Sequence, residues 1–251
     1  MKRYYFFFII SCVHTLGWTQ DSIIVFDRPG IAESPYIVDV QRWQIETGVG
    51  YAEFSGISEA VLPSLLLRKY IFNNTELRYA FNYEPQMLAI IKENIKSDFD
   101  PMALGIKTKL CKEKGIRPES SFLLNTYFPM QLIGKKNTSG TFNLETGFQF
   151  HNNFNETFGL NYNIGTIFSN IDTKGIIYYS SCLNITVANN LGLFVETFGY
   201  VPIQKKPELG FDIGIVYNPT RKSQIDISII DNIEFQNHYA SVLIGYSIIF
   251  Y

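Results

Sequence analysis

The residues able to carry chemistry are few and scattered in this sequence. Beyond residue 20 there are two histidines, His151 and His238, and two cysteines, Cys111 and Cys182. No Gly-x-Ser-x-Gly, His-Glu-x-x-His or phosphate-binding loop occurs, and Gly48-Val49-Gly50 lacks the third glycine of a dinucleotide fingerprint. Two histidines make a weak metal site. We therefore expect no enzyme, cofactor or metal, with a barrel hydrolase around His151 as the remaining enzyme alternative.

Charged residues suggest a different chemistry, that of a polar passage. Within several short segments they alternate with apolar residues, so in a strand they would share one face. The basic members are Arg68, Arg78, Lys107 and Lys109. The acidic members are Glu46, Glu76, Glu145, Glu196, Asp212 and Asp226. In a closed sheet, the basic wall of strands two to four would lie roughly opposite Glu196, Asp212 and Asp226, and the field between the walls would orient dipolar solutes. The alternative is a filled lumen in which these charges pair with one another, Glu46 and Glu76 pairing locally with Arg68 and Arg78.

A period of two dominates the chain from about residue 42 onward, and it predicts strands with unlike faces. From Arg42 to Tyr51, for example, Trp43, Ile45 and Val49 alternate with polar residues or glycine. Twelve such segments are expected, near 42–53, 62–71, 75–84, 102–112, 119–129, 141–151, 156–168, 174–186, 191–201, 208–217, 223–230 and 239–250. Most are 9 to 12 residues long, which is enough to cross the hydrocarbon layer when tilted.

The connections between these segments alternate in length. Every second connection reads as a short turn: 73–74, 113–118, 152–155, a stretch centred on 189–190, and Asn218-Pro219-Thr220. The two longest connections, 85–101 and 130–140, fall on the other side. This alternation is typical of outer-membrane barrels, whose periplasmic turns are short, and places the first strand's start on the periplasmic side.

Composition favours a membrane barrel over a soluble sandwich. Only 18% of the residues are charged and 16% are aromatic, whereas a soluble sandwich carries a surface rich in Lys and Glu. The apolar face carries Tyr and Phe towards strand ends, as an interfacial girdle does. The predicted fold class is all-β: over residues 42–251, a closed antiparallel transmembrane β-barrel of about twelve strands in an up-and-down meander.

The N-terminus resembles an export signal. Lys2 and Arg3 precede a short apolar run, and Gly17-Trp18-Thr19 fits a cleavage site ahead of Gln20. We expect residues 1–19 to be a signal peptide and the mature chain to reach a bacterial outer membrane. Lipidation at Cys12 is the alternative, because Ile9-Ile10-Ser11-Cys12 resembles a lipobox.

Residues 20–41 form a lead-in that precedes the first strand. Pro29 and Pro35 exclude it from a strand ladder, and Pro29-Gly30 suggests a tight turn. Asp27 or Glu33 could pair with Arg28 or with an arginine of the lumen. We expect this segment to form a small periplasmic plug through Asp27, Arg28 and Glu33; the alternative is a disordered lead-in.

Two stretches near the start resemble a bacterial family. Asp27-Arg28-Pro29, Glu33-Ser34-Pro35 and Gln44-Ile45-Glu46-Thr47-Gly48 are similar to the opening of the family labelled the putative MetA-pathway of phenol degradation. Arg68 and the Glu76-Leu77-Arg78 stretch resemble its second and third strands. The resemblance covers about the first sixty mature residues. It implies an outer-membrane location and a role in uptake or efflux of small, sometimes aromatic, compounds.

The function expected is a passive channel or transporter for small solutes, which the resemblance suggests are hydrophobic or aromatic. A non-conducting structural or adhesive barrel with a filled lumen is the alternative. The expected partners are outer-membrane lipid, the barrel-assembly machinery during insertion, and a small-molecule solute. Nucleic acid is not expected, because a net charge of −2 provides no basic face.

Overall fold

The fold was examined in a computed structural model of the chain. The structure describes residues 25–54, 57–81, 102–128, 142–169, 175–202, 207–232 and 239–251. The predicted signal peptide and Cys12 lie outside these residues, as do His238 and most of the two longest connections. The described residues include no helix of the length and apolarity needed to cross a membrane.

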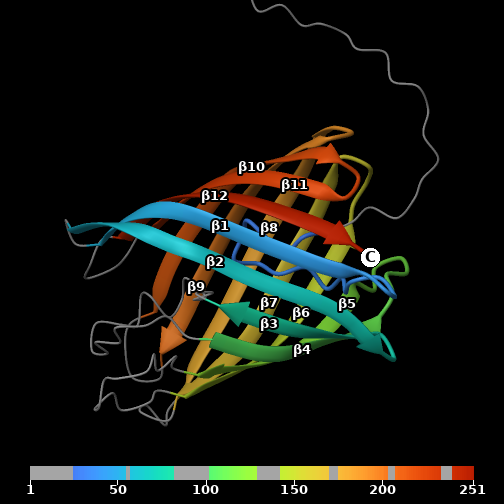
Figure 1. The fold of residues 1–251 in the computed structure, drawn as a ribbon, viewed down its shortest axis with the longest axis horizontal. Helices are drawn as coiled ribbons and strands as arrows, with labels where there is room; N and C mark the ends of the chain where they lie inside the picture. The colour runs from blue at the N-terminus through green and yellow to red at the C-terminus, as the bar shows by residue number, and fades with distance from the viewer. Residues whose placement is uncertain are drawn as a thin grey trace, which may run out of the picture.

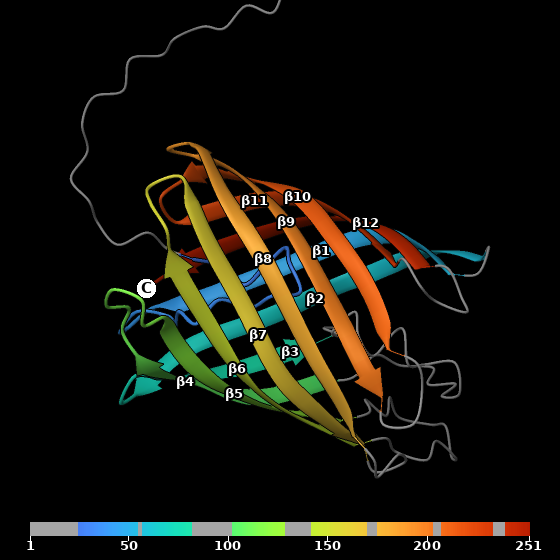
Figure 2. The same cartoon turned by 180° about the vertical axis from the view of Figure 1, so that it is seen from behind.

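Twelve strands make up the described structure, as the alternation predicts. Their bounds are β1 Trp43–Phe54, β2 Ile57–Phe72, β3 Thr75–Phe81, β4 Met102–Cys111, β5 Glu119–Phe128, β6 Asn143–Asn153, β7 Phe158–Ser169, β8 Ile176–Ala188, β9 Leu191–Pro202, β10 Glu208–Thr220, β11 Ser223–Asn232 and β12 Tyr239–Phe250. Every strand pairs antiparallel with its sequence neighbours, and β1 pairs with β12 along its whole length, from Trp43 opposite Phe250 to Phe54 opposite Tyr239. The sheet is therefore a closed up-and-down barrel (Figures 1 and 2).

The two faces of the sheet separate as predicted. Ile213, Ile227 and Ile244 face outward with about half of their surface exposed, which suits contact with lipid chains. Neighbouring residues such as Asp212, Asp226 and Gly245 face inward. All backbone polar groups of a membrane-spanning segment need partners, and closure without an edge provides them.

The start of β1, the end of β12 and the short turns lie at one end of the barrel, here called the turn end; the opposite end is called the loop end. Asn73 and Asn74 form the β2–β3 turn with positive φ angles of 47° and 57°, which asparagine tolerates. The predicted turn at Asn218-Pro219-Thr220 is wrong by about three residues. β10 continues to Thr220 through a register shift after Tyr217, and the turn falls on residues 221–222.

Strand β2 begins earlier than predicted, at Ile57 instead of residue 62. Its extra residues pair with Gly50 to Phe54 of β1, beyond a register shift between Gly48 and Gly50. The cause is visible in the sequence of this stretch, which contains Pro63 and lacks the regular alternation used to delimit strands. β1 and β2 thus project as a long hairpin at the loop end (Figure 1).

Candidate functional site

Residues 26–38 cross the interior of the barrel near the turn end. Phe26, Ala32 and Val38 are at most 6% exposed, and the segment appears inside the barrel as a dark blue trace (Figure 2). It adds no strand to the sheet. Wall carboxylates accept hydrogen bonds from its backbone N–H groups instead, and these carboxylates come from β1, β3 and β9. A chain without secondary structure can be buried more readily when carboxylates accept hydrogen bonds from its amides, as they do here from Arg28, Ala32 and Val38.

Asp27 is the residue of this segment most enclosed by cations. Its Oδ2 atom lies 2.7 Å from the Arg78 Nη1 atom, 2.7 Å from Lys107 Nζ and 3.1 Å from Arg68 Nη1. Burial alone would raise the pKa of the Asp27 carboxyl, but Arg68, Lys107 and Arg78 together hold that pKa well below its usual range. The carboxylate therefore stays ionised inside the barrel.

A second carboxylate of the segment reaches the same cations. Glu33 Oε1 accepts a hydrogen bond from Arg78 Nη2 at 2.7 Å, and Glu33 Oε2 lies 3.2 Å from Lys107 Nζ. Lys107 also donates to the Ser34 carbonyl at 3.0 Å. The segment is thus tied to β3 and β4 through two acidic side chains and one backbone carbonyl.

Glu46 and Glu76, predicted as part of the acidic wall, lie among these cations. Arg68 Nε donates to Glu76 at 2.8 Å, and Arg68 Nη1 donates to Glu46 at 3.1 Å. Both carboxylates also hold the segment, since Glu46 accepts from the Arg28 backbone N–H at 2.9 Å and Glu76 accepts from that of Val38 at 2.8 Å. They therefore balance the basic side chains locally.

The acidic side of the barrel contacts Arg28, Ile31 and Ala32 of the segment. Glu196 on β9 accepts hydrogen bonds from the backbone N–H groups of Ile31 and Ala32 at 2.9 Å and 2.5 Å. Arg28 Nη2 lies 3.3 Å from Asp226 on β11. The segment presents carboxylates to the basic wall and a guanidinium to the acidic wall, so its charges complement both.

Two glycines make room for Arg28 against the wall. A Cβ atom on Gly48 of β1 or on Gly245 of β12 would overlap the Arg28 guanidinium. These residues are direct partners across the β1–β12 pair that closes the barrel. Because alternation identifies glycine only as a residue of the polar face, sequence reasoning does not reveal this role.

Three predicted wall residues stand apart from the segment. Glu145 accepts from Asn125 at 2.9 Å and from the Tyr127 hydroxyl at 2.5 Å. Lys109 pairs with Glu119 near the turn end. Asp212 is fully buried opposite Glu196 in the β9–β10 register, and neither of its carboxylate oxygens has a hydrogen-bond partner among the described residues.

Apolar side chains fill much of the interior towards the loop end. One cluster joins inward residues of β7, β8, β9, β11 and β12, and Ile31 of residues 26–38, here called the crossing segment, packs against it. Its buried members are Ile167, Tyr178, Phe198, Tyr200, Ile230, Tyr239 and Leu243. A second cluster, formed by Leu66, Ala80, Ala103 and Tyr127, lies on β2 to β5.

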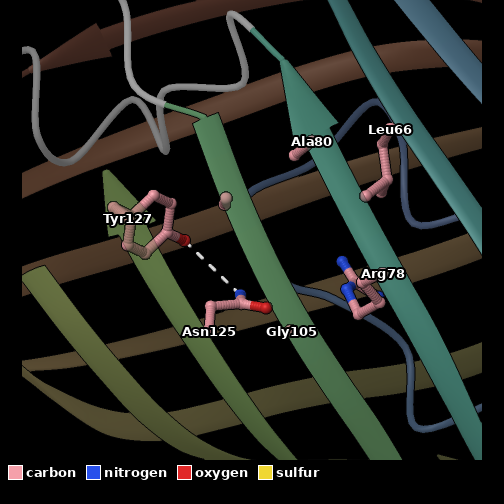
Figure 3. A pocket seen from close by; sticks show the side chains of 7 residues that line it. Leu66, Arg78, Ala80, Gly105, Asn125 and Tyr127 are labelled. Atoms are coloured by element: carbon pink, nitrogen blue, oxygen red, sulfur yellow. Dashed lines mark hydrogen bonds between the residues drawn. The ribbon is translucent and has the colours of Figure 1, made fainter. Parts of the chain in front are cut away.

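A small pocket adjoins this second cluster (Figure 3). It has room for about one water molecule. Its lining combines small or apolar residues with Arg78 and Asn125, the full set being Leu66, Arg78, Ala80, Ala103, Gly105, Asn125 and Tyr127. The pocket therefore connects apolar wall with the cation cluster.

The remaining candidate residues form no catalytic arrangement in the described part of the chain. His151 is buried, with Nδ1 2.6 Å from the Asn161 amide oxygen and its ring 5.5 Å from that of Tyr36. Burial and the nearby Glu119 raise the pKa of Tyr36 to about 12. Cys111 and Cys182 are free thiols on β4 and β8. No three His, Cys, Asp or Glu side chains among the described residues are grouped as metal ligands would be.

Sequence reasoning missed several polar residues that complete the network. Gln44 donates to Glu46 at 2.8 Å, and Gln224 donates to the Arg28 carbonyl at 3.0 Å. Ser34 donates its hydroxyl to Asp27 at 2.9 Å. Gln44 and Gln224 occupy the polar face of their strands, so their orientation could be inferred. The Arg28 partner of Gln224, however, lies in a segment that has no periodicity.

The geometry is that of an outer-membrane β-barrel with an occupied interior. The sequence matches the family described as "Putative MetA-pathway of phenol degradation" over residues 26–248. The chain belongs to this family, which confirms the resemblance seen at its start. No curated protein matches the chain.

Solved structures of outer-membrane barrels share this fold. An outer-membrane channel from Pseudomonas putida F1 is 10% identical, with a TM-score of 0.56, and the match covers 86% of this chain and 98% of that one. The NanC porin is 9% identical, with a TM-score of 0.55 and coverage of 81% and 98%. The KdgM porin, solved with disordered oligogalacturonate, is 8% identical, with a TM-score of 0.52 and coverage of 82% and 99%. These proteins are named as channels and porins, and at such low identity the likeness establishes the fold.

Proposed function

We propose that this protein is a passive outer-membrane channel for small solutes, closed in the described state by residues 26–38. In this proposal residues 1–19 direct export, and the turn end faces the periplasm, as short turns do in this class. The protein is not an enzyme. Its partners are the lipid around its apolar outer face, the barrel-assembly machinery during insertion, and the solute.

The observation that carries this proposal is that residues 26–38, and not the strands themselves, fill the turn-end half of the interior. A strand wall cannot move without breaking the sheet, whereas residues 26–38 are held only by side-chain contacts and by amides donated to carboxylates. Removing this segment would expose the inward polar residues of the turn-end half, such as Glu46, Arg68 and Asp226. An interior filled by a separable segment is what a gated channel needs.

The solutes proposed are small, with an apolar or aromatic body. Twelve strands about 4.8 Å apart and tilted by about 40° enclose a backbone diameter on the order of 25 Å, which inward side chains narrow further. The loop-end half offers tyrosines and aliphatic residues as its inner surface. The family to which the chain belongs is described by a phenol-degradation pathway, which fits solutes of this class.

Planar-bilayer recording tests the channel function. The full mature chain is expected to give rare or small current steps, and deletion of residues 21–38 is expected to give large, frequent steps, because the passage loses its obstruction. Substitution of the outward-facing Lys69 by Met serves as a control and should behave as the parent. An identical current after the deletion would contradict the gating role.

The second candidate function is a structural or adhesive barrel that conducts nothing. The loop-end cluster favours it, because inward side chains of five strands pack there at 7% exposure or less. Silence of both the parent and the deletion variant in the bilayer, with both correctly folded in detergent, would support this alternative over the channel.

A further inference from the structure

The cation cluster of β2, β3 and β4 has more charge than its own wall balances. Arg68, Arg78 and Lys107 are each at most 2% exposed. The wall supplies two carboxylates within ion-pair distance of them, Glu46 and Glu76, and the crossing segment adds Asp27 and Glu33. Among the described residues, the ion-pair partners of Lys107 all belong to the segment, so compensation of this charge depends on the segment.

Lys107 shows this dependence most sharply. Its ammonium group contacts Asp27 at 2.7 Å, the Ser34 carbonyl at 3.0 Å and Glu33 at 3.2 Å. All three partners belong to the crossing segment, and none of its ion pairs or hydrogen bonds within the described structure goes to the wall. Leaving a buried charge without a counter-ion is strongly unfavourable. Departure of the segment would leave Lys107 facing the passage without an ion-pair partner among the described residues, so a solute anion would be attracted to it.

We propose that Arg68, Arg78 and Lys107 form a binding site for the carboxylate of a small solute, and that Asp27 and Glu33 occupy this site as built-in ligands until a solute displaces them. The proposal rests on the channel function proposed above and adds to it a solute class and a trigger for opening. Planar guanidinium groups bind carboxylates in directed pairs, and a lysine adds a compact charge.

The surroundings of the cluster suit a carboxylate attached to an apolar body. Arg78 lines the small pocket together with Leu66, Ala80, Ala103 and Tyr127, and Figure 3 shows Arg78 on the same side of the pocket as Leu66 and Ala80. A solute whose carboxylate replaced Asp27 or Glu33 would place its remaining atoms against small and aromatic side chains. Benzoate has this form, and benzamide is its uncharged match.

Single-channel recording of the full mature chain tests the trigger. The solute and the segment compete for the same cations, so benzoate binds more tightly to the open state, in which the segment has left. Because such coupling is reciprocal, bound benzoate raises the population of the open state by the same factor. We expect saturating benzoate to raise the open probability about tenfold, and benzamide to leave it unchanged. Lys107→Met should abolish the benzoate response, whereas Lys69→Met, which alters the outward neighbour of Arg68, should keep it.

Calorimetric binding of benzoate provides a readout that does not need a current. Asp27→Asn/Glu33→Gln removes both built-in carboxylates, so this variant should bind benzoate about tenfold more tightly than the parent does, with no gain for benzamide. Equal affinity of the variant for benzoate and benzamide would overturn the carboxylate site, even in a protein that conducts. Tight benzoate binding without any current would retain the site and reject the channel.

Discussion

The two halves of the barrel interior are filled by different means. At the turn end, a segment without secondary structure is held by buried charges from β1, β2, β3, β4, β9 and β11. Towards the loop end, the wall fills the space with its own side chains, mainly tyrosine, phenylalanine and aliphatic residues. The difference indicates two roles: apolar packing between strands stabilises the barrel itself, whereas the ionic network, together with apolar contacts of Ile31 and Ala32, holds the crossing segment.

Charge networks and apolar clusters also differ in how they respond to change. An apolar contact is non-directional and stabilises in proportion to area, so its loss weakens the whole cooperative unit. A buried ion pair contributes little net stability against an apolar substitute, but removal of one partner is costly. Each half can therefore be tested separately, by substitutions that affect one readout and spare the other.

The largest effect is expected from truncation in the apolar half. Phe198 is 1% exposed, and its ring lies against Gly210 and 5.9 Å from the ring of Tyr200. Phe198→Ala should lower the free energy of unfolding by about 3–5 kcal/mol, the usual cost of a buried Phe→Ala change, as measured by denaturant titration in micelles. Phe211→Ala, on the outward face, should cost less. Equal losses would show that the inward apolar cluster contributes no more to stability than the outward face does.

A smaller effect is expected where Arg28 meets the wall. In a Gly48→Ala variant the added methyl would displace the Arg28 guanidinium and separate it from Asp226. The amide hydrogens of Ile31 and Ala32, which bond to Glu196, should then exchange faster, on the order of tenfold, whereas barrel unfolding should change little. Gly192→Ala is the control, because its Cβ would make only an ordinary contact with the Ile185 carbonyl. Similar exchange rates in both variants would count against a role for Arg28 in holding the segment.

The smallest effect is expected from moderate acid. The folded-state pKa of Asp27 is depressed, so the stability it contributes is present above its unfolded value of about 3.9 and is lost only as pH falls through the much lower folded value. The carboxyl carbon chemical shift of Asp27 should therefore stay constant between pH 7 and pH 4. A model peptide should begin to titrate over that interval. Titration of Asp27 near pH 4 would show that the cations do not enclose it.

The strands and their faces were predictable because both follow from a local period. The twelve predicted segments agree with the twelve strands, and residues such as Arg68 and Asp226 lie on the inward face that alternation assigns them. The turn after β10 was misplaced because Asn218-Pro219 has turn-forming residues, yet a register shift after Tyr217 carries the strand past them. Local composition does not reveal such a shift.

The contacts of the crossing segment could not be predicted in the same way. Ile31 and Glu196 are 165 residues apart in sequence, and Arg28 and Asp226 are 198 apart. Which wall charge faces which segment residue depends on the register of every strand between them. The types of Asp27, Arg28 and Glu33 suggested ion pairing with the lumen, but their partners followed only from the closed structure.

The position of Arg28 bears on the order in which the molecule can form. Its guanidinium lies over Gly48 and Gly245, one on each side of the seam between the first and last strands, so its resting place does not exist until β12 has joined β1. Arg28, which precedes every strand in the sequence, is thus among the last residues to acquire its native neighbours.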